Sequence, residues 1–512
     1  MSNRLSVGLL VAILGCNGSA KDSVVETDAD TDTDTDTDTD TDTDTDTDTD
    51  TDSDSDSDSD SQPDISGAPF IIYWTIDTLS TPAAQDTDYC GWMQKTMAGH
   101  GLDAACLDGG IAPSTWTGEA HVRQLFPTTM AGIGRKDIQP ACYNKSALVL
   151  LAEALDGVSV WGADNPVFAA GVVSEPCEDG TNPWVFGVDH VFHASGMDED
   201  MAQVPEEDRP VRLAVEAMLD AASDGSAVVG YLNDLQAGGH RPRCFYDPYN
   251  EPCDALWQYA VQFGLVGAKD DREAAWLDHN FWATLSTALP IELADRPKEL
   301  SDMTWGAIID AAAYFRDDSM APDIARVVEG LEALGRLDDL SIVFLGDHGE
   351  VPCVQEPVTG MISCDHAGVP SWWLTPVPVY TVPASLGEDM VTGGYAGDAD
   401  TPWSTVNATH GLYASVGVPV PGSWPMEPPG VASSWQCLDG RVRAARIAGN
   451  VSLRCAESLC QGYEWRPLTS LLDRPAVIDP VPPEVADYLA PAGDYPHQFA
   501  AACEVPIDMM RF

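Results

Sequence analysis

The sequence predicts an α/β fold in which a mainly parallel central sheet is flanked by helices and followed by a small C-terminal subdomain. Two observations lead to this class. Short apolar, β-branched runs alternate with a longer helical pattern, and three of the four predicted strands end beside an acidic residue. Strands that alternate with helices and carry polar groups at their ends are typical of a parallel sheet with a ligand site at its carboxyl edge.

The four predicted strands are apolar runs bounded by polar or turn-forming residues. They cover residues 69–76, 227–232, 341–345 and 377–382. Asp77 follows the first strand, Asn233-Asp234 follows the second, and Asp347 comes shortly after the third. We expect the three acidic ends to meet at one edge of the sheet. The prolines in the fourth run place it near a sheet edge, because proline cannot donate to a strand ladder.

A long helical pattern lies between the second and third strands. From about Trp305 to Leu337, apolar residues recur at intervals close to 3.6 residues. Pro322 lies inside this pattern, and a proline in a helix interior removes a backbone hydrogen bond. We therefore expect a helix that packs on the sheet and is broken near Pro322.

Residues 341–350 carry the clearest chemical signal in the chain. The apolar run ends in Asp347-His348-Gly349-Glu350. Carboxylate oxygen and imidazole nitrogen are ligands that divalent cations take in polar clefts, so this pattern predicts a metal site. The alternative is that Asp347 caps the next helix while His348 faces solvent.

A candidate nucleophile lies in the first third of the chain. The sequence from Ala112 predicts a loop and then a helix, with Thr117 just before Gly118-Glu119-Ala120-His121. A hydroxyl at a helix N-terminus meets free backbone N–H groups and the positive end of the dipole. That position suits a nucleophile that receives an anion. The alternative is that Thr117 is only an N-cap.

The first residues predict export. Arg4 precedes an apolar run, and Ile13-Leu14-Gly15-Cys16 resembles a bacterial lipoprotein cleavage box, so residues 1–16 form the predicted signal peptide. The apolar run is too short to span a bilayer. Lipidation of Cys16 would tie an exported protein to the bacterial cell envelope, at the outer membrane or cell surface, through the lipid anchor alone. The alternative is an ordinary secretory signal with a chance cysteine.

Residues 17–65 form a predicted acidic linker of Thr-Asp and Ser-Asp repeats. The repeat has no Lys or Arg and nothing apolar to bury, which predicts disorder and, through charge repulsion, extension. We interpret it as a spacer between the lipid anchor and the folded body. Loose calcium binding by the repeat is the alternative.

The net charge of −57 excludes some partners. A strongly acidic surface repels nucleic acid, so no nucleic-acid partner is expected. An anionic substrate would need a local positive centre, which a bound cation supplies.

The chain has 13 cysteines, and an even number remains once Cys16 is set aside. In an exported chain this predicts disulfides. The short-range candidates are Cys244–Cys253, Cys353–Cys364 and Cys455–Cys460. The spacing of the cysteines does not indicate a zinc ribbon.

Four segments in order resemble the sulfatases and related hydrolases of the alkaline phosphatase superfamily. Residues 72–79 resemble their first strand, 113–126 their nucleophile loop and helix, 302–350 their long helix and Asp-His-Gly-Glu site, and 406–421 the segment before their C-terminal subdomain. The resemblance implies an alkaline-phosphatase-like α/β hydrolase domain at 66–430 and a C-terminal subdomain at 431–512.

The resemblance also implies a ligand set. By position, Asp77, Asp347 and His348 would hold a divalent metal ion, either Ca, Zn or Mn, with Thr117 as both nucleophile and ligand. The metal would lower the pKa of the hydroxyl and neutralise charge on the transferred group.

Two further histidines match family positions. His240, in His240-Arg-Pro242, matches a His-x-Pro motif whose imidazole contacts the ester oxyanion or protonates the leaving group. His366, in Asp365-His-Ala-Gly-Val-Pro370, matches a substrate-binding histidine of the site. We expect a Cys353–Cys364 bridge to hold His366 over the cleft, facing His240.

The sequence departs from the sulfatase pattern in one important place. Sulfatases convert a Cys or Ser in Cys/Ser-x-Pro-x-Arg to formylglycine, whereas Thr117 to His121 contains no cysteine, proline or arginine at those places. Threonine cannot become formylglycine, and it is the nucleophile in phosphodiesterase and phosphoethanolamine-transferase relatives. We therefore expect phosphodiesterase or phosphatase activity to exceed sulfatase activity.

The sequence leaves open whether a second metal ion binds. Thr78 stands where many sulfatases have a second metal aspartate, and Asp234 and His240 are spaced too widely for the Asp-x-x-x-His motif of two-metal relatives. Gln236 would then occupy the Asp position of that motif.

The sequence thus predicts a metal-dependent hydrolase, or transferase, of phosphate or sulfate esters. The alternative is a catalytically degenerate lipoprotein of the same fold that binds anionic ligands or glycans without turnover. A calcium-binding adhesin on an acidic stalk is a third hypothesis, which rests on the Thr-Asp repeat alone.

Overall fold

The fold is described from a computed structural model. The residues that it describes are 67–126, 140–164, 168, 176–194, 206–234, 249, 251–262, 264, 266–267, 269, 271–272, 297–350, 354–355, 362–363, 371–398, 400–424, 426–438, 441–456, 459–466 and 475–482.

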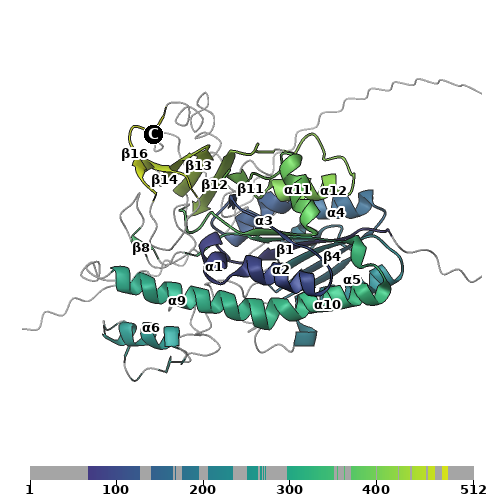
Figure 1. The fold of residues 1–512 in the computed structure, drawn as a ribbon, viewed down its shortest axis with the longest axis horizontal. Helices are drawn as coiled ribbons and strands as arrows, with labels where there is room; N and C mark the ends of the chain where they lie inside the picture. The colour runs from purple at the N-terminus through teal and green to yellow at the C-terminus, as the bar shows by residue number, and fades with distance from the viewer. Residues whose placement is uncertain are drawn as a thin grey trace, which may run out of the picture. The chain divides into compact units, whose positions relative to one another are not determined.

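Residues Ser61–Phe512 form one compact unit, built on a seven-stranded mixed sheet (Figure 1). The strands in spatial order are β2 (Ala105–Leu107), β10 (Val379–Val382), β7 (Leu340–Gly346), β1 (Phe70–Ile76), β6 (Val228–Asp234), β4 (Val158–Ala163) and β5 (His190–His193).

Most of this sheet is parallel, which confirms the predicted fold class. Strand β1 pairs in parallel with β6 and β7, and β4 pairs in parallel with β5 and β6. Strand β10 runs antiparallel to both of its neighbours, β7 and β2. The fourth predicted strand is therefore second from an edge, and Pro376 and Pro378 precede its first ladder residue, Val379.

Helices cover both faces of the sheet, each over its own buried cluster. The face seen below the sheet in Figure 1 carries α1 (Thr81–Asp86), α2 (Tyr89–Gly99), α5 (Pro210–Ser223), α9 (Pro297–Phe315) and α10 (Ala321–Leu334). The other face carries α3 (Thr117–Leu125), α4 (Ala147–Ala154), α11 (Ala384–Thr392) and α12 (Asn407–Ser415).

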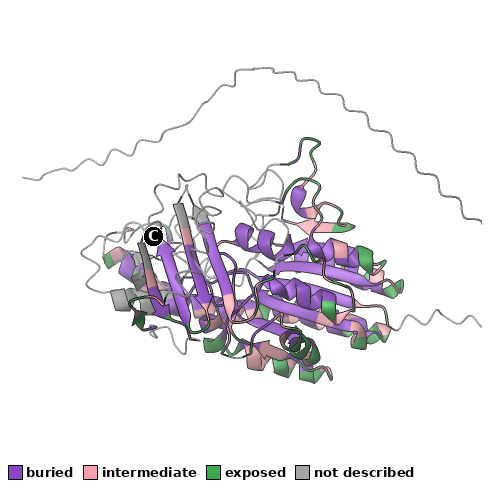
Figure 2. Ribbon diagram, turned by 90° about the horizontal axis from the view of Figure 1, so that it is seen from above, coloured by how far each residue is buried: buried purple, intermediate pink, exposed green. Residues whose placement is uncertain are grey.

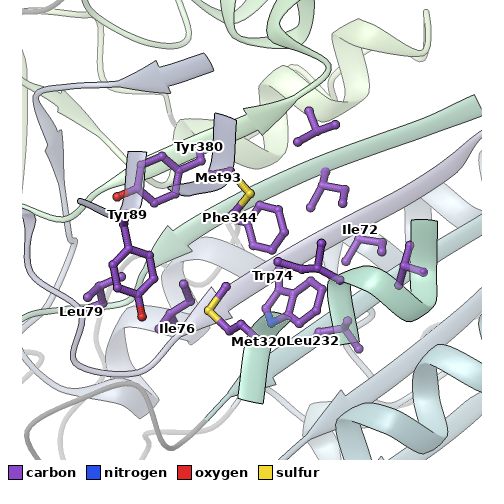
Figure 3. Packing of buried hydrophobic residues seen from close by; sticks show 14 of the residues in the cluster. Ile72, Trp74, Ile76, Leu79, Tyr89, Met93, Leu232, Met320, Phe344 and Tyr380 are labelled. Atoms are coloured by element: carbon purple, nitrogen blue, oxygen red, sulfur yellow. The ribbon is translucent and has the colours of Figure 1, made fainter. Parts of the chain in front are cut away.

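The two clusters draw on alternate residues of the central strands. Ile72, Trp74 and Ile76 of β1 belong to the cluster under α9 and α10, where Trp74 stacks on Phe344 (Figure 3). Ile71 and Tyr73 belong to the cluster under α3 and α4. This period of two follows from strand geometry, and it makes the strands buried on both faces, as Figure 2 shows.

The long predicted helix is interrupted, as expected, close to Pro322. A π-helical turn, Arg316–Met320, separates α9 from α10. Pro322 has no N–H to donate to the turn before it, and local widening of the helix accommodates that loss. Gly335 follows the last residue of α10 and caps it with a φ of 68°, the left-handed conformation that glycine adopts at a helix end.

A separate antiparallel sheet lies in the C-terminal part of the chain and begins at Val431. Its strands in order are β12 (Val431–Leu438), β13 (Arg441–Ala448), β14 (Val451–Ala456), β15 (Leu459–Glu464) and β16 (Val477–Ile478).

The remaining elements are short, apart from α6. They are the strand pairs β3 (Gly110–Ile111) with β11 (Trp403–Ser404) and β8 (Val354–Gln355) with β9 (Ile362–Ser363), the helix α6 (Glu251–Gln262) and 3-10 turns at Pro183–Val185, Glu206–Asp208 and Leu337–Asp339. None of the helices in the described ranges is both long and apolar enough to cross a membrane.

Disulfides are present, as the sequence predicts. Cys90 bonds Cys106, which ties α2 to the edge strand β2, and Cys142 bonds Cys177. Cys253 and Cys455 are also disulfide-bonded, and Cys455 stands opposite Cys460 in the ladder of β14 and β15.

Candidate active site

The candidate site lies at the carboxyl edge of the central sheet, where two neighbouring parallel strands end. Ile76 of β1 is in register with Gly346 of β7, so the residues that follow them, Asp77 and Asp347, lie side by side. His348 comes next on the same strand end. All three side chains are buried, with 0% of their surface exposed.

Asp77, Asp347 and His348 are placed to hold one metal ion. One ligand atom of each lies within 4.8 Å of the others. His348 Nε2 is 3.6 Å from Asp77 Oδ1 and 3.5 Å from Asp347 Oδ2. His348 Nδ1 lies 2.9 Å from the Gly349 carbonyl, which only accepts, so Nδ1 carries a hydrogen; in the neutral ring that metal binding requires, the Nε2 lone pair faces the carboxylates.

This donor set fits a divalent cation. Two carboxylates and a neutral imidazole nitrogen meet in a buried volume, which is costly without a positive charge. Asp347 Oδ2 has no short, well-aligned hydrogen bond within the described part of the chain, and its contacts are His121 Nε2 at 3.4 Å and His348 Nε2 at 3.5 Å. The carboxylate oxygens suit Ca or Mn, and the imidazole nitrogen suits Zn.

Asp347 is held as an anion by the groups around it. Its Oδ1 accepts hydrogen bonds from the backbone N–H of Thr78 at 2.9 Å and of His348 at 2.7 Å. Burial alone would raise the pKa of Asp347, but without a metal the positive charge of a protonated His348, the His121 contact and the Thr78 N–H outweigh it and hold the pKa well below its usual range.

Thr117 lies at the same centre. Its Oγ1 donates to Asp77 Oδ1 at 3.1 Å and lies 3.1 Å from His348 Nε2. Helix α3 begins at Thr117 itself, and Trp116 occupies the N-cap position without a side-chain cap. The expectation that Thr117 precedes the helix is therefore wrong by one residue, and its hydroxyl points to the acidic centre rather than to the helix backbone.

Sequence reasoning missed one residue of the site, His121. It lies four residues after Thr117 on α3, so both side chains project from the same helix face. His121 Nε2 is 3.4 Å from Asp347 Oδ2. The spacing of four was the available signal, because it puts any polar side chain at 121 beside whatever Thr117 faces.

Asp234 shares the sheet edge but not the site. It is in register with Ile76, one position before Asp77, so its side chain lies on the opposite face. There its Oδ2 accepts a hydrogen bond from Trp74 Nε1 at 3.0 Å. The expectation that all three acidic strand ends converge is therefore wrong for Asp234, which lies outside the group of possible metal ligands.

Asp234 and Asp164 form a buried acidic pair on that opposite face. Burial and the charge of Asp164 raise the pKa of Asp234 well above its usual range. Burial raises the pKa of Asp164 to about 6, although Arg209 and the N–H of Val211 lower it in part. Both shifts make the carboxyl groups easier to protonate than an exposed aspartate.

The other sequence-predicted residues lie outside the described residues. These are His240, Gln236, His366, the cysteines Cys353 and Cys364, Cys244 and the lipidation candidate Cys16.

Comparisons with known proteins find similar solved structures. No protein-family model and no curated protein matches the chain. A phosphonate monoester hydrolase from Silicibacter pomeroyi matches with a TM-score of 0.48 at 12% identity, over 84% of this chain and 96% of that one. A phosphonate monoester hydrolase of Agrobacterium radiobacter gives 0.46 at 10%, over 85% and 94%. A 2-O GAG sulfatase gives 0.44 at 8%, over 78% and 85%.

Proposed function

We propose that this protein is a metal-dependent hydrolase, or transferase, of phosphate or sulfate esters, with Thr117 as its nucleophile. One observation carries the proposal. Thr117 Oγ1 lies 3.1 Å from Asp77 Oδ1 and 3.1 Å from His348 Nε2, at the N-terminus of α3. A hydroxyl among metal-type ligands at the positive end of a helix suits attack on an anionic ester.

Asp77, Asp347 and His348 would hold the metal in this proposal, with Thr117 beside it. A bound divalent ion lowers the pKa of a neighbouring hydroxyl and neutralises charge on the transferred group. Asp77 orients the Thr117 hydroxyl through the 3.1 Å hydrogen bond and receives its proton. The two N–H donors to Asp347 Oδ1 fix the orientation of that carboxylate.

The reaction proceeds in two displacements. Thr117 Oγ1 forms a bond to the phosphorus or sulfur, and the bond from that atom to the leaving oxygen breaks with its electron pair. The leaving oxygen takes up a proton, and His240 is the residue proposed for that role. Water then displaces the threonine ester, which releases inorganic phosphate or sulfate from a monoester, or a phosphate monoester from a diester, and restores the Thr117 hydroxyl.

Phosphate esters are the favoured substrates. Threonine cannot form formylglycine, and a threonine ester that water displaces suits phosphoryl transfer. His366 is the residue proposed to contact the substrate. Export and anchoring at Cys16 remain part of the proposal, and the two described disulfides agree with an oxidising compartment.

The test is turnover of nitrophenyl phosphate, a phosphodiester and nitrophenyl sulfate with added Ca, Mn or Zn. We expect phosphodiesterase or phosphatase activity that exceeds sulfatase activity and disappears in Thr117→Ala. Sulfatase turnover that survives in Thr117→Ala would show that the nucleophile is wrong. Metal binding without turnover on any ester would favour the catalytically degenerate binding protein.

A further inference from the structure

A chain of buried hydrogen bonds runs from strand β6 to His121, which in turn makes a close polar contact with the proposed metal ligand Asp347. Asn233 Nδ2 donates to Thr75 Oγ1 at 2.8 Å, and Thr75 Oγ1 lies 3.1 Å from the Tyr231 hydroxyl. The Tyr231 hydroxyl is 3.0 Å from His121 Nδ1, and His121 Nε2 is 3.4 Å from Asp347 Oδ2. None of these side chains is more than 1% exposed, so water does not compete for these contacts.

The two polar groups that contact its ring nitrogens orient the His121 ring. An ionised carboxylate only accepts hydrogen bonds, so the His121 nitrogen that faces Asp347 must carry a hydrogen for the contact to be favourable. Asn233 Nδ2 lies 3.4 Å from the same nitrogen, but its short hydrogen bond, at 2.8 Å, goes to Thr75 Oγ1. In a neutral ring this leaves Nδ1 as an acceptor for the Tyr231 hydroxyl. Burial raises the pKa of Tyr231 well above its usual value, so the phenol keeps the proton that it donates.

We propose that His121 is a positioning residue, which the Asn233–Thr75–Tyr231 chain orients so that its Nε2–H holds Asp347. The inference rests on the proposed metal site and deepens it. His121 and Thr117 lie four residues apart on α3. The contact between His121 and Asp347, which follows β7, therefore also holds the helix that carries Thr117 beside the proposed metal site. Groups that orient ligands in this way tune metal affinity.

Tyr231→Phe is the sharpest variant, because it removes one hydroxyl and keeps a ring that packs on Trp161 and Phe168. We expect its affinity for Ca, Mn or Zn, measured by titration calorimetry on metal-free protein, to fall roughly 10- to 100-fold, as for other partners of metal ligands. The His121 ring should also shift toward the Nδ1–H tautomer, which nitrogen chemical shifts of ¹⁵N-histidine report.

Tyr73→Phe is the matched control. Tyr73 is buried in the same cluster and stacks with Tyr231 at 6.4 Å between ring centroids. Its hydroxyl makes no hydrogen bond among the residues that the structure describes. Removing it deletes the same atom from the same core, so metal affinity and the His121 tautomer should not change.

His121 variants separate a hydrogen-bond role from packing. His121→Gln keeps an N–H donor that can reach Asp347, and it identifies the His121 signal among the ten histidines. We expect His121→Gln to bind metal more tightly than His121→Leu.

The possible results distinguish failure of the positioning role from failure of the proposed function. If the wild type binds metal and Tyr231→Phe matches it in affinity and tautomer, the positioning role is overturned while the proposed function stands. An equal loss in Tyr73→Phe also overturns it, because packing then explains the effect. If the wild type binds no metal, the proposed function fails, and the tautomer of metal-free protein still shows whether the chain orients His121.

Discussion

The guanidinium carbon of Arg123 lies 3.3 Å from the centroid of the Trp435 ring. Arg123 is on the nucleophile helix α3, and Trp435 is on β12, the first strand of the C-terminal sheet. Arg123 also donates to the carbonyls of Pro113 and Trp435, and the Trp435 N–H donates to Pro113. Thr115 Oγ1 donates to Gln436 Oε1 at 3.1 Å. The C-terminal sheet therefore braces the loop that leads into Thr117.

Loss of this brace should affect turnover more than folding. We expect Trp435→Ala to lower kcat by about 100-fold, because a misplacement of about 1 Å at a reacting group has that effect. Trp435→Phe keeps an aromatic face for Arg123 and should recover most of kcat. Steady-state kinetics with a parallel thermal melt checks this, and an unchanged kcat in folded Trp435→Ala would show that the C-terminal sheet does not position Thr117.

The proposed metal ligands can be tested against an acid on the same sheet edge. Asp347→Ala removes a carboxylate from the group with Asp77 and His348, so we expect metal affinity to fall by more than the roughly 100-fold upper value for outer partners. Asp234→Asn is the control, because Asp234 faces the opposite side and an amide oxygen still accepts from Trp74. Elemental analysis after dialysis should find metal in the control and not in Asp347→Ala.

The buried pair on the other face predicts a pH dependence of stability. Burial raises the pKa of Asp164 to about 6, above the ordinary value of 3.8 for an aspartate. The folded state then binds the proton more tightly than the unfolded state, so the free energy of unfolding falls as the pH rises from about 4 to about 6. In Asp164→Asn this fall should be smaller by roughly 1–3 kcal/mol.

Urea denaturation at pH 4.5 and pH 7 measures that difference. The amide introduced by Asp164→Asn keeps an acceptor for the Val211 N–H, so a general loss of stability is not expected. Asp220→Asn, on the exposed part of α5, serves as the control and should leave the pH dependence as in the wild type. A slope that is identical in Asp164→Asn and the wild type would show that Asp164 does not titrate in this range.

Features that depend on local sequence were predictable. The apolar runs before Asp77 and Asp347 identify the two strands, and the parallel order places their ends together. The threonine at the start of a helix identified Thr117 for the same reason, since caps and strand ends have short sequence signals.

Features that depend on register or on distant pairs were not predictable. Asp234 is the last residue of β6, whereas Asp77 is the first residue after β1. This shift of one residue puts the two side chains on opposite faces of the sheet. His121 gains its role only through Tyr231, which lies 110 positions away. The Arg123 and Trp435 contact joins α3 to a strand of another sheet, which no local pattern indicates.

The proposed function requires Thr117 to form a covalent ester during turnover. The most direct test is peptide mass spectrometry on protein that is acid-quenched during turnover of a phosphate ester with added metal. We expect a phosphoryl adduct on the peptide that contains Thr117, absent without metal and absent in Thr117→Ala. Product formation with no adduct on Thr117, or an adduct on another residue that persists in Thr117→Ala, would contradict it.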